Sequence, residues 1–242
     1  MHLTLDIGNT QIKAHLFRDG QCIDQYKSNG IEEIKKAIAP YRNQLSAIIF
    51  SDVSGLFDQA RVAEVFGTLP CYGVKSLQWP FNSQYTTPQT LGDDRIALVA
   101  AAVRLQTDKA VVVIDAGTCL TIDLLTADHT YIGGTISPGL AMRCKGLQHY
   151  TGSLPLVTVD TPVSNIGNTT STALQAGVYW GMVHEIDGHI DRFKKDFPAL
   201  TVILTGGDAH RLSKSVKNSI FVAPNFLAEG LDFLLTFNTQ RI

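Results

Sequence analysis

Two short segments of this 242-residue chain place a carboxylate, a glycine and a threonine directly after an apolar strand. The first is LTLDIGNT at residues 3–10, and the second is VVVIDAGT at residues 111–118. A carboxylate at a strand end, such as Asp6 or Asp115, can hold a metal ion, often through water, while the glycine and threonine let N–H groups and a hydroxyl approach phosphate oxygens. The repeat indicates two related half-molecules that face each other across a cleft.

Phosphoryl transfer requires Mg²⁺ on the phosphates, a positive charge and hydrogen-bond donors around the transferred group. We expect the metal at Asp6 and Asp115, with phosphate contacts from Gly8, Asn9, Thr10, Lys13, Gly117 and Thr118. A single copy would equally fit a β-hairpin turn, where Asp, Gly and Asn are favoured. Lys13 is the weakest member of this set, since a lone lysine on a strand is usually solvated.

A third motif, LTGGDA at residues 204–209, lies between an expected strand and an expected helix. Gly206 and Gly207 allow a ligand to approach the backbone closely, and in a kinase adenosine would pack there. The alternative is a plain strand-to-helix connection with Asp208 as the N-cap. The motif alone does not separate these two interpretations.

A fourth motif, Gly92-Asp93-Asp94-Arg95, begins a helix after a loop. Carboxylates at a helix N-terminus interact favourably with the helix dipole, which is the structural explanation. The functional one is a base that orients a substrate hydroxyl, with an arginine beside it for a substrate carboxylate or phosphate. Adjacent helix residues point about 100° apart, so only one of the two carboxylates can face a cleft well.

The elements that carry these motifs predict an α/β fold with a mixed sheet in each half. Each half begins with three consecutive strands, at 2–8, 11–18 and 21–27 and at 110–115, 119–125 and 130–136. Further strands are expected at 46–53, 72–74, 201–205 and 219–222, helices at 31–38, 56–66, 93–105, after 138, 170–196 and 225–237, and a loop at 79–90. We predict two domains, 1–106 and 107–242.

Composition excludes several classes of function. The formal net charge of −2 gives no basic field for nucleic acid or anionic lipid. The four cysteines form no C-x-x-C pair, which argues against a zinc site. The chain has no P-loop and no dinucleotide fingerprint. Its longest apolar stretch is too short for a membrane span, and it does not begin with a signal peptide. We therefore expect a cytoplasmic protein with reduced thiols, no nucleic-acid partner and no membrane association.

Five motifs resemble, in order and separation, those of the bacterial type III pantothenate kinases: Asp6-Ile7-Gly8-Asn9-Thr10, Gly92-x-Asp94-Arg95, Asp115-x-Gly117-Thr118, Gly133-Gly134-x-Ile136-x-Pro138-Gly139 and Thr205-Gly206-Gly207-Asp208. The resemblance spans essentially the whole chain. It implies the duplicated ribonuclease-H-like architecture of the superfamily of acetate and sugar kinases, Hsp70 and actin. The reaction it implies is phosphorylation of pantothenate by ATP to 4′-phosphopantothenate, the first step towards coenzyme A.

The resemblance also implies roles for individual residues. Asp94 would be the catalytic base, while Tyr85, Gly92 and Arg95 would bind pantothenate. These kinases are homodimers, and Thr170 would reach the pantothenate of the other subunit. They also depend on K⁺ or NH₄⁺ near the subunit interface, for which the sequence identifies no ligands.

One residue departs from the family pattern, because Asp93 stands where the family usually has a small or apolar residue. If both carboxylates faced the cleft, Asp93 would raise the pKa of Asp94, so we expect Asp93 to point away. Two other functions stay open: another kinase or a phosphatase of the same superfamily, or a non-catalytic, nucleotide-binding regulatory or accessory protein. The presence of Asp94 and Arg95 favours an enzyme.

Overall fold

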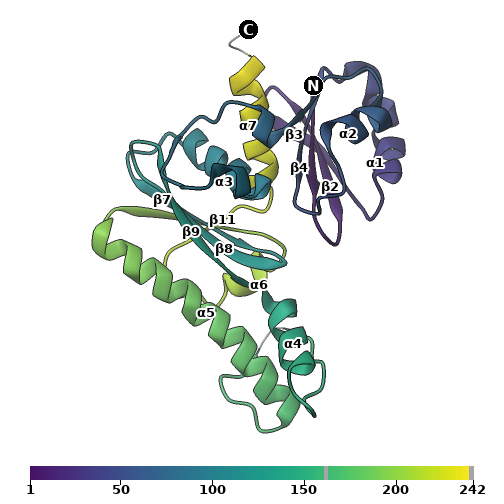
Figure 1. Ribbon diagram of the computed structural model, residues 1–242. Helices are drawn as coiled ribbons and strands as arrows, with labels where there is room; N and C mark the ends of the chain where they lie inside the picture. The colour runs from purple at the N-terminus through teal and green to yellow at the C-terminus, as the bar shows by residue number, and fades with distance from the viewer. Residues whose placement is uncertain (161–162, 240–242) are drawn as a thin grey trace. The chain divides into compact units, whose positions relative to one another are not determined.

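The computed structural model describes residues 1–160 and 163–239, which form two compact units (Figure 1). Unit 1 comprises Met1–Thr107, Asp128–Tyr131 and the C-terminal segment from Asn225, and unit 2 comprises Asp108–Ala127 and Ile132–Pro224. These units are groups of residues in mutual contact. The division into domains 1–106 and 107–242 stays a prediction, and residues 240–242 of the second lie outside the described part.

Unit 1 is built on a five-stranded mixed sheet with the order β3-β2-β1-β4-β5. The first three strands form the expected antiparallel meander, while β4 and β5 run parallel to β1. The strands are β1 (His2–Ile7), β2 (Ile12–Arg18), β3 (Gln21–Ser28), β4 (Ala47–Asp52) and β5 (Cys71–Gly73). Because side chains alternate along β1, Leu3, Leu5 and Ile7 enter one core, and Asp6 lies on the opposite face.

Four α-helices pack on this sheet: α1 (Ile31–Ile38), α2 (Gln59–Phe66), α3 (Asp93–Arg104) and α7 (Phe226–Thr239). The first two pack against the core that contains Leu3 and Leu5, and α3 and α7 pack together and against β4. Helix α2 begins three residues later than predicted, because the Asp58 carboxylate caps it by accepting the Arg61 N–H at 2.8 Å. The predicted loop 79–90 contains a two-residue strand, β6 (Asn82–Ser83), and a 3₁₀ turn, Pro88–Thr90; further 3₁₀ turns are Ala39–Gln44 and Val74–Ser76.

Unit 2 repeats the strand arrangement of unit 1. Its sheet has the order β11-β10-β7-β8-β9, and β6 pairs with the first two residues of β9. Strand β7 is antiparallel to β8 and parallel to β10, as β1 is to β2 and β4. The strands are β7 (Ala110–Ala116), β8 (Cys119–Leu125), β9 (Thr130–Pro138), β10 (Leu200–Thr205) and β11 (Phe221–Val222). This repetition confirms the predicted duplicated α/β fold.

Three helices complete unit 2: α4 (Leu140–His149), α5 (Thr170–Asp196) and α6 (Ala209–Leu212). The long helix α5 lies alongside the sheet and packs against α4 (Figure 1). A capping box between Thr169 and Thr172 explains why α5 begins at the predicted residue. Helix α6 is a single turn. Among the residues that the structure describes, no helix combines the length and the apolarity that a membrane span requires.

Candidate active site

The turn between β1 and β2 presents the first predicted phosphate-binding group. Asp6 lies directly opposite Lys13 on the neighbouring strand, and its Oδ2 is 3.5 Å from the lysine Nζ. The Gly8 N–H donates to the Gln11 carbonyl at 3.2 Å and closes the turn. Asn9 and Thr10 are exposed beyond it, so their polar groups are accessible to a ligand.

The environment of the Asp6 carboxyl group disfavours its charged form. Burial raises its pKa above the ordinary value of 3.8, and the Coulombic attraction and hydrogen bond of Lys13 oppose that rise without cancelling it. A carboxylate whose desolvation is only partly compensated gains from an additional cation. Asp6 therefore suits a metal ligand.

The turn between β7 and β8 has the same construction. Asp115 precedes it, the Gly117 N–H donates to the Cys119 carbonyl at 3.0 Å, and Thr118 is exposed. Gly139 packs directly on this turn, since its N–H donates to the Thr118 carbonyl at 3.1 Å. A Cβ at Gly139 would overlap the Gly117 carbonyl oxygen, which gives the last glycine of the motif at 133–139 a structural role.

Gly206 brings the end of β10 against Asp115. Thr205 pairs with Asp115, and Gly206 then adopts φ +95°, a conformation that suits glycine. A Cβ at Gly206 would overlap the Asp115 carboxylate, whereas a Cβ at Gly207 would meet open space. The Asp208 N–H donates to the Ala116 carbonyl at 3.0 Å. The two glycines therefore differ: the first is required by close packing, and the second leaves the backbone open.

The N-terminus of α3 carries the two adjacent carboxylates, and they have different partners. The Asp94 Oδ1 accepts the Arg95 N–H at 2.8 Å, while the Asp93 Oδ1 lies 3.4 Å from the Lys75 Nζ. Burial raises the pKa of Asp93, although Lys75 and a hydrogen bond from the Asp52 backbone lower it in part. Gly92 is the N-cap, and a Cβ there would overlap the Asp94 carboxylate. Glycine at this position lets Asp94 adopt its orientation.

Arg95 is 4% exposed and lies in an aromatic cluster. Its Nη2 donates to the Tyr131 hydroxyl at 2.8 Å, and its guanidinium carbon is 5.7 Å from the centroid of the Tyr85 ring. The two tyrosine rings stack with centroids 6.1 Å apart. Tyr85 and Arg95, which are ten residues apart in the sequence, are thus brought together with Tyr131 from β9.

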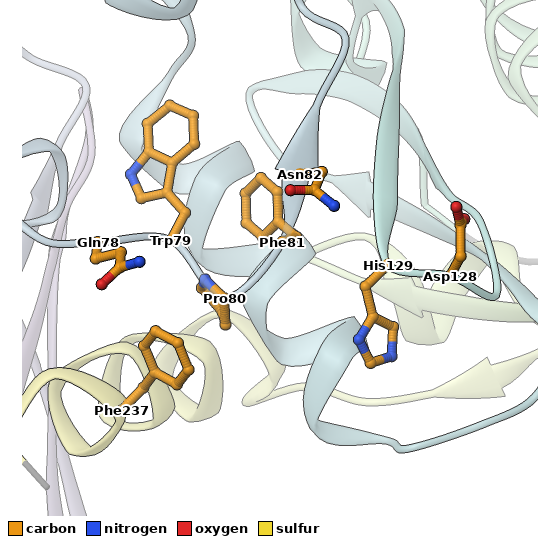
Figure 2. A pocket seen from close by; sticks show the side chains of 8 residues that line it. All are labelled: Gln78, Trp79, Pro80, Phe81, Asn82, Asp128, His129 and Phe237. Carbon is orange, nitrogen blue, oxygen red and sulfur yellow. The ribbon is translucent and has the colours of Figure 1, made fainter. Parts of the chain in front are cut away.

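A cavity of about 300 Å³ lies beside this cluster in unit 1 (Figure 2). Its lining consists of Gln78, Trp79, Pro80, Phe81, Asn82, Asp128, His129 and Phe237. Phe81 connects it to the cluster, because its ring stacks on Trp79 at 5.6 Å and meets the Tyr131 ring edge to face at 6.1 Å. None of the site residues predicted from the sequence lines this cavity.

Comparison with known proteins assigns the fold and the family. The model of a family described as type III pantothenate kinase matches residues 2–192. The chain belongs to this family. A type III pantothenate kinase of Christiangramia forsetii is 41% identical over 247 aligned residues, which cover 100% of both chains.

Two solved structures show the same fold at low sequence identity. A conserved Campylobacter jejuni protein, provisionally described as a Baf family transcriptional activator, gives a TM-score of 0.66 at 23% identity and covers 98% of this chain and 99% of its own. A ROK family glucokinase of Streptomyces griseus, in complex with glucose and AMPPNP, gives 0.53 at 14% identity, with 98% and 99% covered. These likenesses confirm the predicted actin-like kinase architecture.

Within this type III pantothenate kinase fold, the predicted site residues fall into two groups. Unit 1 holds the β1–β2 turn and the N-terminus of α3, and unit 2 holds the β7–β8 turn and the glycines after β10. Thr170 also belongs to unit 2, where it is exposed at the first position of α5. That the two groups face each other across a cleft stays a prediction.

The carboxylates suit a metal that is held mainly by its substrate. Among residues 1–160 and 163–239, no three His, Cys, Asp or Glu side chains cluster as metal ligands. Mg²⁺ typically keeps several waters and binds one or two carboxylates together with substrate phosphates. Single carboxylates such as Asp6 and Asp115 match that mode, whereas a site built entirely from protein side chains would need a cluster.

Tyr131 is the residue that sequence reasoning missed. It lies at the start of β9, next to Ser83 of β6, and this pairing joins segments that are 48 positions apart. Its sequence neighbours, Thr130 and Ile132, give no indication of a partner in α3. The strand pairing and the contact with Arg95 depend on tertiary structure that no local pattern encodes.

Proposed function

We propose that this protein transfers the γ-phosphoryl group of ATP to the primary hydroxyl of pantothenate and produces 4′-phosphopantothenate and ADP. One observation carries the proposal: at the N-terminus of the buried helix α3, the Asp94 carboxylate accepts the Arg95 N–H. The absence of a Cβ at Gly92 makes room for this carboxylate. A base and a cation on adjacent residues of one rigid element suit a small substrate that carries an alcohol and a carboxylate. Membership of the type III pantothenate kinase family supports that substrate.

Asp94 accepts the proton of the substrate hydroxyl. As the alcohol oxygen bonds to the γ-phosphorus, the bond between that phosphorus and the bridging oxygen of ADP breaks, and the proton moves to an Asp94 carboxylate oxygen. The transition state of phosphoryl transfer is loose in most analyses, so proton transfer is late and the main task of Asp94 is to orient the hydroxyl.

Arg95 binds the pantothenate carboxylate, with Tyr85 and Gly92 forming the adjoining surface. The buried guanidinium sits among aromatic rings, where a charge-assisted hydrogen bond to a carboxylate is stronger than in water. Tyr85 is partly exposed and lies over Arg95, so the substrate reaches the arginine beside this ring.

The phosphates of ATP bind at the two strand turns, with adenosine at Gly206 and Gly207. Gly8, Asn9, Thr10 and Lys13 serve one turn, and Gly117 and Thr118 serve the other. Asp6 in unit 1 and Asp115 in unit 2 would each offer a carboxylate to Mg²⁺, which would supply positive charge to the phosphates. The raised pKa of Asp6 supports this assignment, because a bound cation offsets the cost of its buried charge. Because the reaction consumes ATP, we assign it to the cytoplasm.

The protein acts as a homodimer, and we assign to its interface four exposed apolar side chains of unit 2: Ile132 and Ile136 on β9, and Met142 and Tyr150 on and after α4. These side chains are 40%, 62%, 40% and 85% exposed, and large exposed apolar side chains are candidates for an interaction site. Thr170 of one subunit then reaches the pantothenate of the other. K⁺ or NH₄⁺ binds near this interface.

Ile136→Glu should yield monomers in light scattering and lower activity. A dimeric variant would contradict the assignment of Ile136 to the dimer interface.

Pantothenate-dependent release of ADP tests the proposal. Purified protein is assayed with ATP and Mg²⁺, with and without pantothenate, and with K⁺, NH₄⁺ or neither. We expect release that requires pantothenate and a monovalent cation. Release without pantothenate, or no release with both cations supplied, would contradict the pantothenate kinase assignment and favour another substrate or a regulatory role. Activity that is independent of monovalent cations would remove only the cation requirement.

A further inference from the structure

Tyr131 is held in place by its backbone and by its ring. The Gln84 N–H donates to the Tyr131 carbonyl at 2.9 Å, and the Asn82 N–H donates to the His129 carbonyl at 3.0 Å, so β6 and β9 are joined on both sides of Thr130. The Tyr131 side chain has no exposed surface. Its hydroxyl therefore has a defined position with respect to α3.

Arg95 needs such a fixed partner. An arginine side chain has several rotatable bonds, and ordering it costs up to about 2 kcal/mol of conformational entropy. The Tyr131 hydroxyl accepts one guanidinium N–H at 2.8 Å, and the guanidinium carbon lies over the Tyr85 ring, 5.7 Å from its centroid. Together these two contacts restrict the position of the guanidinium before any substrate arrives.

We propose that Tyr131 is a positioning residue for pantothenate, because it fixes the Arg95 guanidinium in the orientation that binds the substrate carboxylate. This inference rests on the role of Arg95 given above. It adds to the pantothenate site a residue from β9, a strand whose later residues belong to unit 2.

A side chain of the neighbouring cavity wall also packs against the Tyr131 ring. Phe81 contacts the Tyr131 ring edge to face and stacks on Trp79. Both Phe81 and Trp79 line the cavity (Figure 2). Edge-to-face and stacked pairs are favourable arrangements for aromatic rings. Phe81 is 9% exposed, so it fills the space beside Tyr131 and keeps that ring from moving towards the cavity.

Tyr131→Phe removes the hydroxyl and keeps the ring. A hydrogen bond to a charged group is stronger than a neutral one, so its loss should raise the KM for pantothenate about tenfold. The kcat and the KM for ATP should change less than about twofold, because Asp94 and the phosphate-binding turns are untouched. Tyr179→Phe is the matched control: this tyrosine is 2% exposed, its hydroxyl bonds with the Arg211 carbonyl and with Ser215, and it is not one of the predicted site residues.

A substrate analogue separates positioning of Arg95 from general loss of packing. In the alcohol analogue of pantothenate, CH₂OH replaces the carboxylate, so the analogue cannot use the arginine charge. We expect Tyr131→Phe to leave the KM for this analogue within about twofold of wild type. An equal rise in KM for both substrates would assign Tyr131 a structural role and overturn the inference.

A double substitution and direct calorimetric binding complete the test. If Tyr131 acts through Arg95, Tyr131→Phe should weaken pantothenate binding in wild type and add nothing to Arg95→Ala. Additive effects, or wild-type pantothenate affinity in Tyr131→Phe, would refute the inference. If wild type itself neither binds nor phosphorylates pantothenate, the proposed function fails and the inference fails with it.

Discussion

Gly206→Ala places one methyl group where the backbone ends of β7 and β10 meet. The new Cβ would overlap the Asp115 carboxylate and lie 2.5 Å from the carbonyl carbon and oxygen of Ala116. The Ala116 atoms belong to a buried strand that pairs on both sides, so they cannot move aside cheaply. Residue 206 also has φ +95°, which disfavours alanine.

These two effects set the expected size of the change. A non-glycine residue at positive φ costs about 1 kcal/mol, and forcing a methyl group into a packed site costs about 1–3 kcal/mol. The free energy of unfolding should therefore fall by about 2–4 kcal/mol, which lowers the Tm by about 5–15 °C in a chain of this length. Displacement of Asp115 should also lower kcat/KM for ATP by about 10- to 100-fold.

Calorimetry and steady-state kinetics measure both quantities, and the adjacent glycine is the control. Gly207→Ala adds the same methyl group where no protein atom lies within 4 Å, so it should keep the wild-type Tm, and the comparison of the two variants rests on stability. Wild-type stability and activity in Gly206→Ala would refute the packing argument. An equal fall in Tm from both substitutions would attribute the effect to the loop as a whole and would contradict a specific role of Gly206.

Three further predictions concern the carboxylates. Asp94→Asn should lower kcat at least about 100-fold in steady-state assays, because general-base catalysis contributes about 10²–10⁴, and wild-type turnover would dismiss Asp94 as the base. Gly92→Ala should lower kcat with little change in Tm, since its Cβ meets only the tip of the Asp94 side chain; a large fall in Tm would contradict this. The folded-state pKa of Asp6 is raised above 3.8, so its ionisation destabilises the fold as pH rises above that value. Asp6→Asn should therefore raise the Tm at pH 7 while it abolishes activity, and the gain in Tm should shrink towards pH 4; a Tm gain that does not depend on pH would exclude this origin.

Local patterns predicted most of the fold. The alternation of Leu3, Leu5 and Ile7 with Thr4 and Asp6 is typical of a strand, and β1 directs these three apolar side chains into one core. The capping residue Thr169 marks the start of α5 equally well. Each of these features is encoded within a few residues, so the sequence alone is sufficient.

Features that depend on distant segments were not predictable in the same way. Strand β6 has only two residues, and its pairing with β9 gives it strand geometry within a segment predicted as a loop. Helix α7 follows the second repeat in the sequence, yet it packs against α3 and β1 in unit 1. The contact between Tyr131 and Arg95 belongs to this class, because it depends on the pairing of β6 with β9.

The most direct test of the central claim identifies the product and the residue that makes it. Wild type and Asp94→Asn are incubated with ATP, Mg²⁺, K⁺ and pantothenate, and the products are analysed by phosphorus NMR and mass spectrometry. We predict a phosphomonoester on the primary hydroxyl of pantothenate from wild type and almost none from the folded variant. ADP without phosphorylated pantothenate, or equal product from both proteins, would contradict the account.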